Sequence, residues 1–269
     1  MTLEERSNLV LSLARLLYVN GQSTDDTLAA AERSSGALGF RSGIIPRWGE
    51  LELQAEDTQA RLICAVEANP AGVDMDRVAS AMRAVEDLGA GGLAPAAAMD
   101  TITAISKAPP APTGLFALAA GVGAVALAVL FGVQHWPAAA LIFLSAAAGG
   151  ILRRGLAHYS TNLFVQPFCA AFVAGVIGAL AVRYDLSSML RLVAVCPCMV
   201  LVPGPHVLNG ALDVMKGRVS LGGARLLYAG LVVVAISAGL LVGLALLGVS
   251  LPVDPPGRTM DIATTTRPA

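Results

Sequence analysis

Long uncharged stretches in the second half of this 269-residue chain constrain its fold more than any other feature. About 20 consecutive apolar residues are enough for a helix to cross the hydrocarbon core of a bilayer. The chain is 55% hydrophobic, and its mean hydropathy of +0.69 is too high for a soluble globule. The sequence therefore predicts a membrane domain. Four ranges contain no Asp, Glu, Lys or Arg at all: 108–152, 155–182, 192–212 and 226–253.

These ranges divide into about five spans. The first range is too long for one helix, and Gln134-His135-Trp136-Pro137 divides it into a hairpin with Trp136 as an interfacial anchor. The predicted fold class is a membrane all-α bundle of about five transmembrane helices with an N-terminal cytoplasmic α+β domain. The expected spans are residues 114–132, 138–152, 162–182, 189–212 and 225–249.

Residues 1–108 are predicted to form the cytoplasmic α+β domain. Helical periodicity over 3–20 stops at Asn20-Gly21, and Ser23 or Thr24 can cap a second helix. A proline-rich linker then leads to the membrane domain of residues 109–250, and residues 251–269 are expected to be a disordered tail. The remaining elements are expected as strands at 43–48, 50–54 and 61–66 and helices at 74–88 and 95–106.

Charge and motif content exclude several classes of function. Residues 1–110 hold 15 of the 19 acidic residues but only 9 of the 18 basic ones, which argues against a nucleic-acid partner. This part has no histidine, no nucleotide loop and no metal-ligand spacing, so neither an enzyme, a metal nor a cofactor is expected. The acidic residues are interpreted as helix caps or solvated side chains, and the cysteines as packing residues.

The basic residues favour one orientation across the membrane. No secretory signal is recognised, because Glu4, Glu5 and Arg15 interrupt the N-terminus. Five crossings that begin in the cytoplasm place most of the flanking cations inside, in agreement with the positive-inside rule. We therefore expect a multi-pass protein of the cell (inner or plasma) membrane with a cytoplasmic N-terminus. The inside cations are Arg153, Arg154, Lys216, Arg218 and Arg225.

Pro203-Gly204-Pro205 interrupts the fourth span. Lipid-facing backbone does not tolerate such a break, so it needs protein or a water-filled cavity around it, as in transporter substrate sites. His206, Asn209 and Asp213 follow at intervals of three and four residues and share one helical face. Asn162 and Gln166 open the third span. Pro203, Gly204, His206, Asn209, Asp213, Gln166 and Asn162 are therefore the candidate substrate-binding and translocation residues.

Structural roles for these residues remain open. Asp213 lies close to the predicted inner surface, where it is either a coupling site or a solvated acid at a helix end. His206 either lines a cavity, where it could carry a proton, or is structural. Asn209 and Gln166 either bind substrate or cross-brace helices. Glycines at four-residue spacing, such as Gly239 and Gly243, are interpreted as close helix contacts within one chain and not as a dimer face.

The chain resembles the threonine/serine exporter family in three parts. The opening helix ends in Leu17-Tyr18-Val19-Asn20-Gly21-Gln22-Ser23-Thr24, the element order of 1–106 is similar to the family's cytoplasmic module, and Val202-Pro203-Gly204-Pro205 precedes Asn209, Asp213 and Gly217. The resemblance implies proton-driven export of a small amino acid or, in split systems, a dicarboxylate. It carries over Pro203, Gly204, Asn209 and Asp213 as functional positions.

The resemblance covers only the first half of a fused family member, so it implies a second membrane subunit or a homo-oligomer. The hypothesis is a secondary transporter subunit whose partners are a small-molecule substrate and the lipid bilayer. A membrane-anchored regulatory or scaffolding protein with an acidic partner-binding domain is the alternative. The interrupted span discriminates between them, because an anchor gains nothing from a broken helix.

Overall fold

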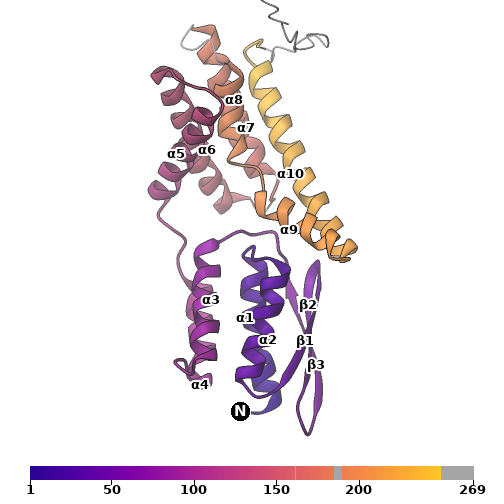
Figure 1. Ribbon diagram of the computed structural model, residues 1–269. Helices are drawn as coiled ribbons and strands as arrows, with labels where there is room; N and C mark the ends of the chain where they lie inside the picture. Colours follow the sequence, from indigo (N-terminus) through magenta and orange to yellow (C-terminus); the bar gives the residue numbers. More distant parts are fainter. Residues whose placement is uncertain (161, 185–189, 250–269) are drawn as a thin grey trace, which may run out of the picture. The chain divides into compact units, whose positions relative to one another are not determined.

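A computed structural model of the protein describes residues 1–160, 162–184 and 190–249 (Figure 1). The chain forms two compact units. Unit 1 combines Met1–Pro112 with Val202–Val234, and unit 2 combines Thr113–Leu201 with the chain from Ala235 onward. Residues 202–234, which the sequence groups with the spans, thus fold in the same unit as the N-terminal residues. The expected tail at 251–269 lies outside the described residues.

Unit 1 contains a small three-stranded sheet together with helices. Its three strands form an antiparallel sheet in the order β1-β2-β3, in which Leu53 lies opposite Ile44 and Cys64. The elements of the unit are α1 (Leu3–Val19), α2 (Thr24–Ala37), β1 (Arg41–Arg47), β2 (Gly49–Glu56), β3 (Arg61–Ala68), α3 (Met75–Gly89), α4 (Pro95–Lys107), α9 (Gly204–Met215) and the first part of α10 (Val219–Ala245).

The core of unit 1 lies between the sheet and α1. Alternate residues of β2, Leu51 and Leu53, are completely buried, while Glu50 and Glu52 of the same strand face outward. Leu9, Leu13 and Leu17 of α1 belong to the same hydrophobic cluster. Helices α1 and α2 lie beside the sheet (Figure 1), and α3 and α4 pack against α1. The alternating pattern of β2 therefore directs one face of the sheet into the core.

Capping side chains begin α1 and α2 where the sequence predicts helices. The Thr2 hydroxyl accepts from the Glu5 amide and Glu5 reaches back to the Thr2 amide, which forms a capping box. Ser23 caps α2 in the same way, and its hydroxyl oxygen accepts from the Asp26 amide. Gly21 has a φ of +97°, a left-handed conformation that glycine adopts without strain, and it ends α1. The α1–α2 connection is therefore short and fixed at both ends.

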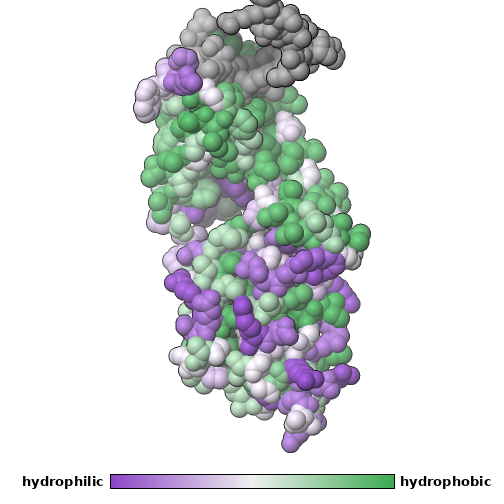
Figure 2. Space-filling model, viewed as in Figure 1, coloured by the Kyte–Doolittle hydropathy of each residue, from purple (hydrophilic) through white to green (hydrophobic). Residues whose placement is uncertain are grey.

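Unit 2 is a bundle of apolar helices. Among the described residues, α5, α6, α7 and α10 are each long and apolar enough to cross a membrane, and α8 with α9 makes a fifth if the pair forms one broken span. Figure 2 shows hydrophobic side chains over these helices and hydrophilic ones over the N-terminal part of unit 1. The elements are α5 (Thr113–Leu130), α6 (Trp136–Tyr159), α7 (Val165–Arg183), α8 (Leu190–Met199) and the end of α10.

Several boundaries differ from the sequence expectation; α6, for example, continues to Tyr159, beyond the expected end at 152. Helix α10 begins at Val219, six residues before the expected position 225, because Arg225 is buried and paired with Asp213 and does not mark a water-exposed helix end. The interruption of the fourth span covers residues 200–203. Gly204 and Pro205 already belong to the first turn of α9, where proline is tolerated because that turn needs no amide donor.

Glycines bring α7 and the end of α10 into backbone contact. A Cβ on Gly239 would overlap the Phe168 carbonyl oxygen, and one on Gly243 would overlap the Phe172 carbonyl oxygen. Gly175 of α7 faces Leu240 in the same way. The predicted close packing at Gly239 and Gly243 is therefore made within the chain.

Candidate functional site

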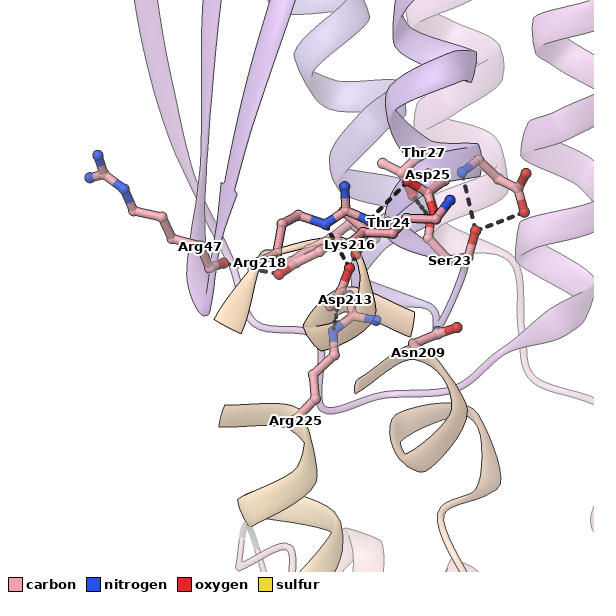
Figure 3. Close-up of polar contacts among 12 residues, drawn as sticks. Ser23, Thr24, Asp25, Thr27, Arg47, Asn209, Asp213, Lys216, Arg218 and Arg225 are labelled. Carbon is pink, nitrogen blue, oxygen red and sulfur yellow. Dashed lines mark hydrogen bonds and ion pairs between the residues drawn. The ribbon is translucent and has the colours of Figure 1, made fainter. Parts of the chain in front are cut away.

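Asp213, in the last turn of α9, lies at the centre of a buried polar cluster (Figure 3). Its side chain is 1% exposed and accepts a hydrogen bond from the Thr24 hydroxyl at 3.0 Å and one from Arg218 Nε at 2.8 Å. A second cation, Arg225, has its Nε 3.5 Å from the Asp213 carboxylate. Asp213 is therefore a buried anion held by two cations and a hydroxyl.

Asp25 extends this cluster toward solvent. Its carboxylate accepts from Lys216 Nζ at 2.7 Å and from an Arg218 terminal nitrogen at 2.9 Å, so Arg218 binds both acids. The hydrogen bond from Lys216 lowers the pKa of Asp25, with Arg218 adding to the effect against a smaller opposing effect of burial. The cluster, called here the Asp213 cluster, consists of Thr24, Asp25, Asp213, Lys216, Arg218 and Arg225.

A tight turn after α9 positions two of these cations. Gly217 has a φ of +80°, and the Arg218 amide donates to the Asp213 carbonyl at 2.8 Å. This closed turn brings the side chains of Lys216 and Arg218 beside the first turn of α2. A Cβ at Gly222 would lie 2.6 Å from the Gly210 carbonyl oxygen, so α9 and α10 approach closely just beyond the turn. The glycines therefore allow the helix pair that holds Asp213 near Arg225.

Arg225 is almost completely buried, at 2% exposure. Its guanidinium carbon lies 5.1 Å from the centre of the Tyr18 ring, a cation–π distance. The Tyr18 hydroxyl donates to the Arg47 carbonyl at 3.0 Å, and burial raises the pKa of Tyr18. Arg225 is therefore enclosed by a carboxylate on one side and an aromatic ring on another.

His206 and Asn209 share the buried face of α9 with Asp213, as their spacing predicts. His206 Nε2 lies 2.8 Å from the Pro70 carbonyl oxygen, and its ring centre lies 5.0 Å from that of Tyr228. The Asn209 amide donates to the Gly21 carbonyl at 3.2 Å. The predicted polar face of α9 therefore binds the α1–α2 connection and the loop that contains Pro70.

The cavity beside these residues is small. Tyr18, His206, Asn209 and Arg225 line a cavity of about 10 Å³, which is near the smallest space that holds one water molecule. His206 Nδ1 is buried without a hydrogen-bond partner among the described residues. The cavity can hold a single water molecule, but it is too small for a metabolite in this conformation.

The other predicted site residues are not members of the Asp213 cluster. Pro203 is the N-cap residue of α9, and the Gly204 backbone has open space where a Cβ would stand. Gln166 lies half-buried in the first turn of α7 in unit 2. Asn162 is exposed, and its side-chain oxygen accepts from the Phe164 amide at 2.9 Å just before α7. Asn162 therefore stabilises the start of a helix.

Sequence reasoning identified Asp213 but missed the functions of its partners. Arg218 and Arg225 were interpreted only as orientation signals, and Thr24 only as a possible cap. Arg225 lies between two uncharged ranges, and burying a cation there costs free energy unless a counter-ion is present. This cost could have indicated the pair of Arg225 with Asp213. Across the described parts of the chain, no group of three or more His, Cys, Asp and Glu side chains could hold a metal ion.

Comparison with known proteins adds to this geometry. A model of the family described as "Putative threonine/serine exporter" matches residues 8–247. A curated relative, the "Probable succinate transporter subunit YjjP" of Klebsiella aerogenes, is 28% identical over 114 residues. That alignment covers 42% of this chain and 44% of the relative, so the chain spans less than half the length of the relative that it matches. No solved structure matches the chain.

Proposed function

Because this chain belongs to the threonine/serine exporter family, we propose that it is a subunit of a secondary exporter that moves a small polar metabolite out of the cell. Threonine, serine or a related small amino acid is the proposed substrate, and the proton-motive force is the proposed driving force. A small dicarboxylate is the second choice, because the relative is named as a succinate transporter subunit.

The observation that carries this proposal is the interruption at residues 200–203. Helix α8 ends at Met199 and α9 begins at Gly204, inside a pair of segments that together are long and apolar enough for one span. Unpaired backbone at membrane depth is tolerated only where protein or a water-filled cavity surrounds it. Broken helices of this kind form the substrate sites of many secondary transporters.

The polar face of α9 is proposed to link the N-terminal domain to the transport path. Three separate contacts hold α9 against the N-terminal part of unit 1: His206 with the loop that contains Pro70, Asn209 with the α1–α2 connection, and Asp213 with the first residue of α2. Any movement of α9 during transport must therefore break or carry these contacts. We propose His206 as a proton carrier because it lines a water-sized cavity and its Nδ1 has no hydrogen-bond partner among the described residues.

The proposed setting is the inner or plasma membrane, with the N-terminus in the cytoplasm. The cations Arg153, Arg154 and Lys216 would then lie on the cytoplasmic side, as the positive-inside rule favours. A second membrane subunit or a second copy of this chain is the proposed partner, since the curated relative is named as a subunit.

Uptake into everted membrane vesicles tests the proposal. Vesicles that contain the full chain should accumulate labelled threonine when a proton gradient is imposed, and a protonophore should abolish the accumulation. His206→Ala and Asp213→Asn should each lower the flux per molecule by about tenfold, which is ~1.4 kcal/mol of barrier. His135→Ala and Asp100→Asn, both at exposed positions, are the matched controls.

Two outcomes would contradict parts of the proposal. If His206→Ala and Asp213→Asn both leave the flux unchanged, these residues are not part of the transport site, and the exporter proposal itself still stands. Absence of gradient-dependent flux of threonine, serine and succinate from the wild type, together with capture of a soluble partner by the full chain in detergent, would favour the scaffolding alternative.

A further inference from the structure

Unit 2 contains a larger cavity that the predicted site residues do not line. Its volume is about 290 Å³, and its walls come from α5, α6, α7, α8 and the first residues of the interruption. Pockets for drug-sized ligands occupy roughly 300–1,000 Å³, so this cavity fits a smaller metabolite. Its main contacts are Phe116, Ser145, Gly149, Arg153, Ala170 and Pro197.

Small residues on one face of α6 leave this space open. Ser145, Gly149 and Arg153 follow at intervals of four residues, so they form a single stripe along the helix. Opposite them, α7 contributes Ala170, which also has a small side chain. A Cβ at Gly149 would meet Ala170 at an ordinary contact distance of 3.5 Å, so backbone crowding does not force glycine at this position.

Ser145 supplies a polar group within the apolar walls. Its side chain is 1% exposed, and its hydroxyl has no hydrogen-bond partner among the described residues. Buried hydroxyls in folded proteins almost always bind a partner, and the exceptions need an explanation. Ser145 lines the cavity while its hydroxyl oxygen is buried, so a rotation of the side chain would bring the hydroxyl to a molecule bound there.

Arg153 supplies a positive charge at the same cavity. It lies two turns beyond Ser145 on α6, which corresponds to roughly 12 Å along the helix axis. The Arg153 side chain is exposed and lines the same cavity as Ser145. A guanidinium group binds carboxylates through paired hydrogen bonds, which an uncharged wall cannot provide.

We propose that this cavity binds a small carboxylate-bearing metabolite, whose carboxylate pairs with Arg153 and whose second polar group hydrogen-bonds to the Ser145 hydroxyl. Leu201, at the interruption, also lines the cavity, so the bound metabolite contacts the segment that is broken. The proposal rests on the proposed exporter function for the identity of the metabolite, but the site itself is argued from the cavity and its two polar side chains.

Ligand binding to the purified full chain in detergent tests the site without transport. The probes are L-threonine and succinate, and L-threonine methyl ester serves as a ligand without a carboxylate. Isothermal titration should show binding of one or both carboxylates but not of the ester. Arg153→Gln should raise the Kd by about tenfold or more, and Ser145→Ala by about threefold to tenfold.

Matched variants separate the site from general damage to the fold. Arg183→Gln and Ser220→Ala change exposed residues outside the cavity, and they should bind as the wild type does. Ala120→Phe fills the cavity from α5 without touching either polar group, and it should also abolish binding. The melting temperature of each variant without ligand shows whether it is folded.

The outcomes distinguish this inference from the exporter proposal. Binding in the wild type that is unchanged in Ser145→Ala, Arg153→Gln and Ala120→Phe would overturn the site, whatever the vesicles transport. Failure of the wild type to bind either carboxylate would also overturn it and would leave a detergent or lipid tail as the occupant. If binding depends on both residues but the chain transports neither probe, the binding site is supported and the exporter proposal is contradicted.

Discussion

Thr24 and Asp213 share a buried hydrogen bond of 3.0 Å although 189 residues separate them in the chain. Thr24 begins α2 directly after the N-cap Ser23, and Asp213 lies in the last turn of α9. The contact therefore ties the α1–α2 connection to a helix that follows four apolar helices in sequence. This hydrogen bond holds the start of α2 and the end of α9 in a defined geometry.

Helix α9 has its polar face buried and its apolar face exposed. His206, Asn209 and Asp213 are at most 7% exposed, whereas Leu208 is 62% and Met215 is 82% exposed. In a water-soluble helix the apolar stripe faces the core and the polar residues face solvent. The inverted arrangement is expected of a helix whose outer face contacts lipid or another apolar surface and whose inner face binds a polar domain.

Asp213→Asn should strongly destabilise unit 1. The substitution removes the negative charge that neutralises Arg218 and the buried Arg225, and an unpaired buried charge typically costs about 3–5 kcal/mol. Trp48 packs against Tyr228 within unit 1, with ring centres 5.6 Å apart, and is one of only two tryptophans in the chain. Thermal unfolding followed by Trp48 fluorescence in a Trp136→Phe background should show a clearly lower Tm.

Asp100→Asn provides the control for this measurement, because Asp100 is exposed on α4. It should leave the Tm within a degree or so of the reference, since surface substitutions usually change stability by about 0.5 kcal/mol or less. Equal Tm values for Asp213→Asn and Asp100→Asn would mean that the Asp213 cluster does not stabilise the unit.

Thr24→Val should have a smaller effect than Asp213→Asn. Valine keeps the branched shape of threonine but cannot donate to Asp213, which retains its two cations. Loss of one hydrogen bond to a charged group costs about 1.5–3 kcal/mol. Thr24→Ser keeps the hydroxyl and should restore most of the difference. If serine behaves like valine in the same unfolding assay, packing and not hydrogen bonding explains the position.

Asp25 should make stability depend on pH in the acid range. Its pKa is held below the ordinary value of 3.8, chiefly by the hydrogen bond from Lys216. A lowered pKa in the folded state means that the stabilisation is fully present above the unfolded value and is lost as the pH falls through the folded value. The Tm difference between the wild type and Asp25→Asn should therefore be constant from pH 7 to about pH 5 and shrink below about pH 4.

The magnitude should be modest, because the Asp25 side chain is 36% exposed and water screens the pair. Raising the salt concentration should reduce the Tm difference at pH 7. The double variant Asp25→Asn with Lys216→Gln should lose little beyond Asp25→Asn alone. Additive losses in the double variant would show that the two side chains do not interact in solution.

The sequence predicts the elements of this fold well where one pattern dominates. The strict alternation of β2 and the capping residues at Ser23 and Asp74 place their elements within one or two residues. The start of α10 was wrong because charge was taken to mark the end of a span. Arg225 lies inside α10 because the Asp213 carboxylate neutralises its charge. Hydrophobic periodicity describes one helix at a time, so it cannot indicate a partner on another helix.

The candidate site was predictable only in part for the same reason. Spacing placed His206, Asn209 and Asp213 on one face of α9, and the structure confirms that shared face. No local pattern indicates that the face binds Thr24, Gly21 and the Pro70 carbonyl. The cavity lined by Ser145 and Arg153 was not predicted. A single serine among alanines and glycines in an apolar helix does not indicate a cavity, because the other walls come from helices whose positions the sequence does not give.

Close packing of α7 against α10 predicts a specific sensitivity in unit 2. Gly243→Ala places a methyl group against the Phe172 carbonyl oxygen, a backbone atom that cannot move aside without shifting α7. Overpacking of this kind costs about 1–3 kcal/mol. Unfolding followed by Trp136 fluorescence in a Trp48→Phe background should therefore show a lower Tm for Gly243→Ala. Gly230→Ala is the control, since a Cβ there meets open space on the same helix and alanine favours helix by about 1 kcal/mol. Equal behaviour of the two variants would mean that the helices are not in backbone contact at Gly243.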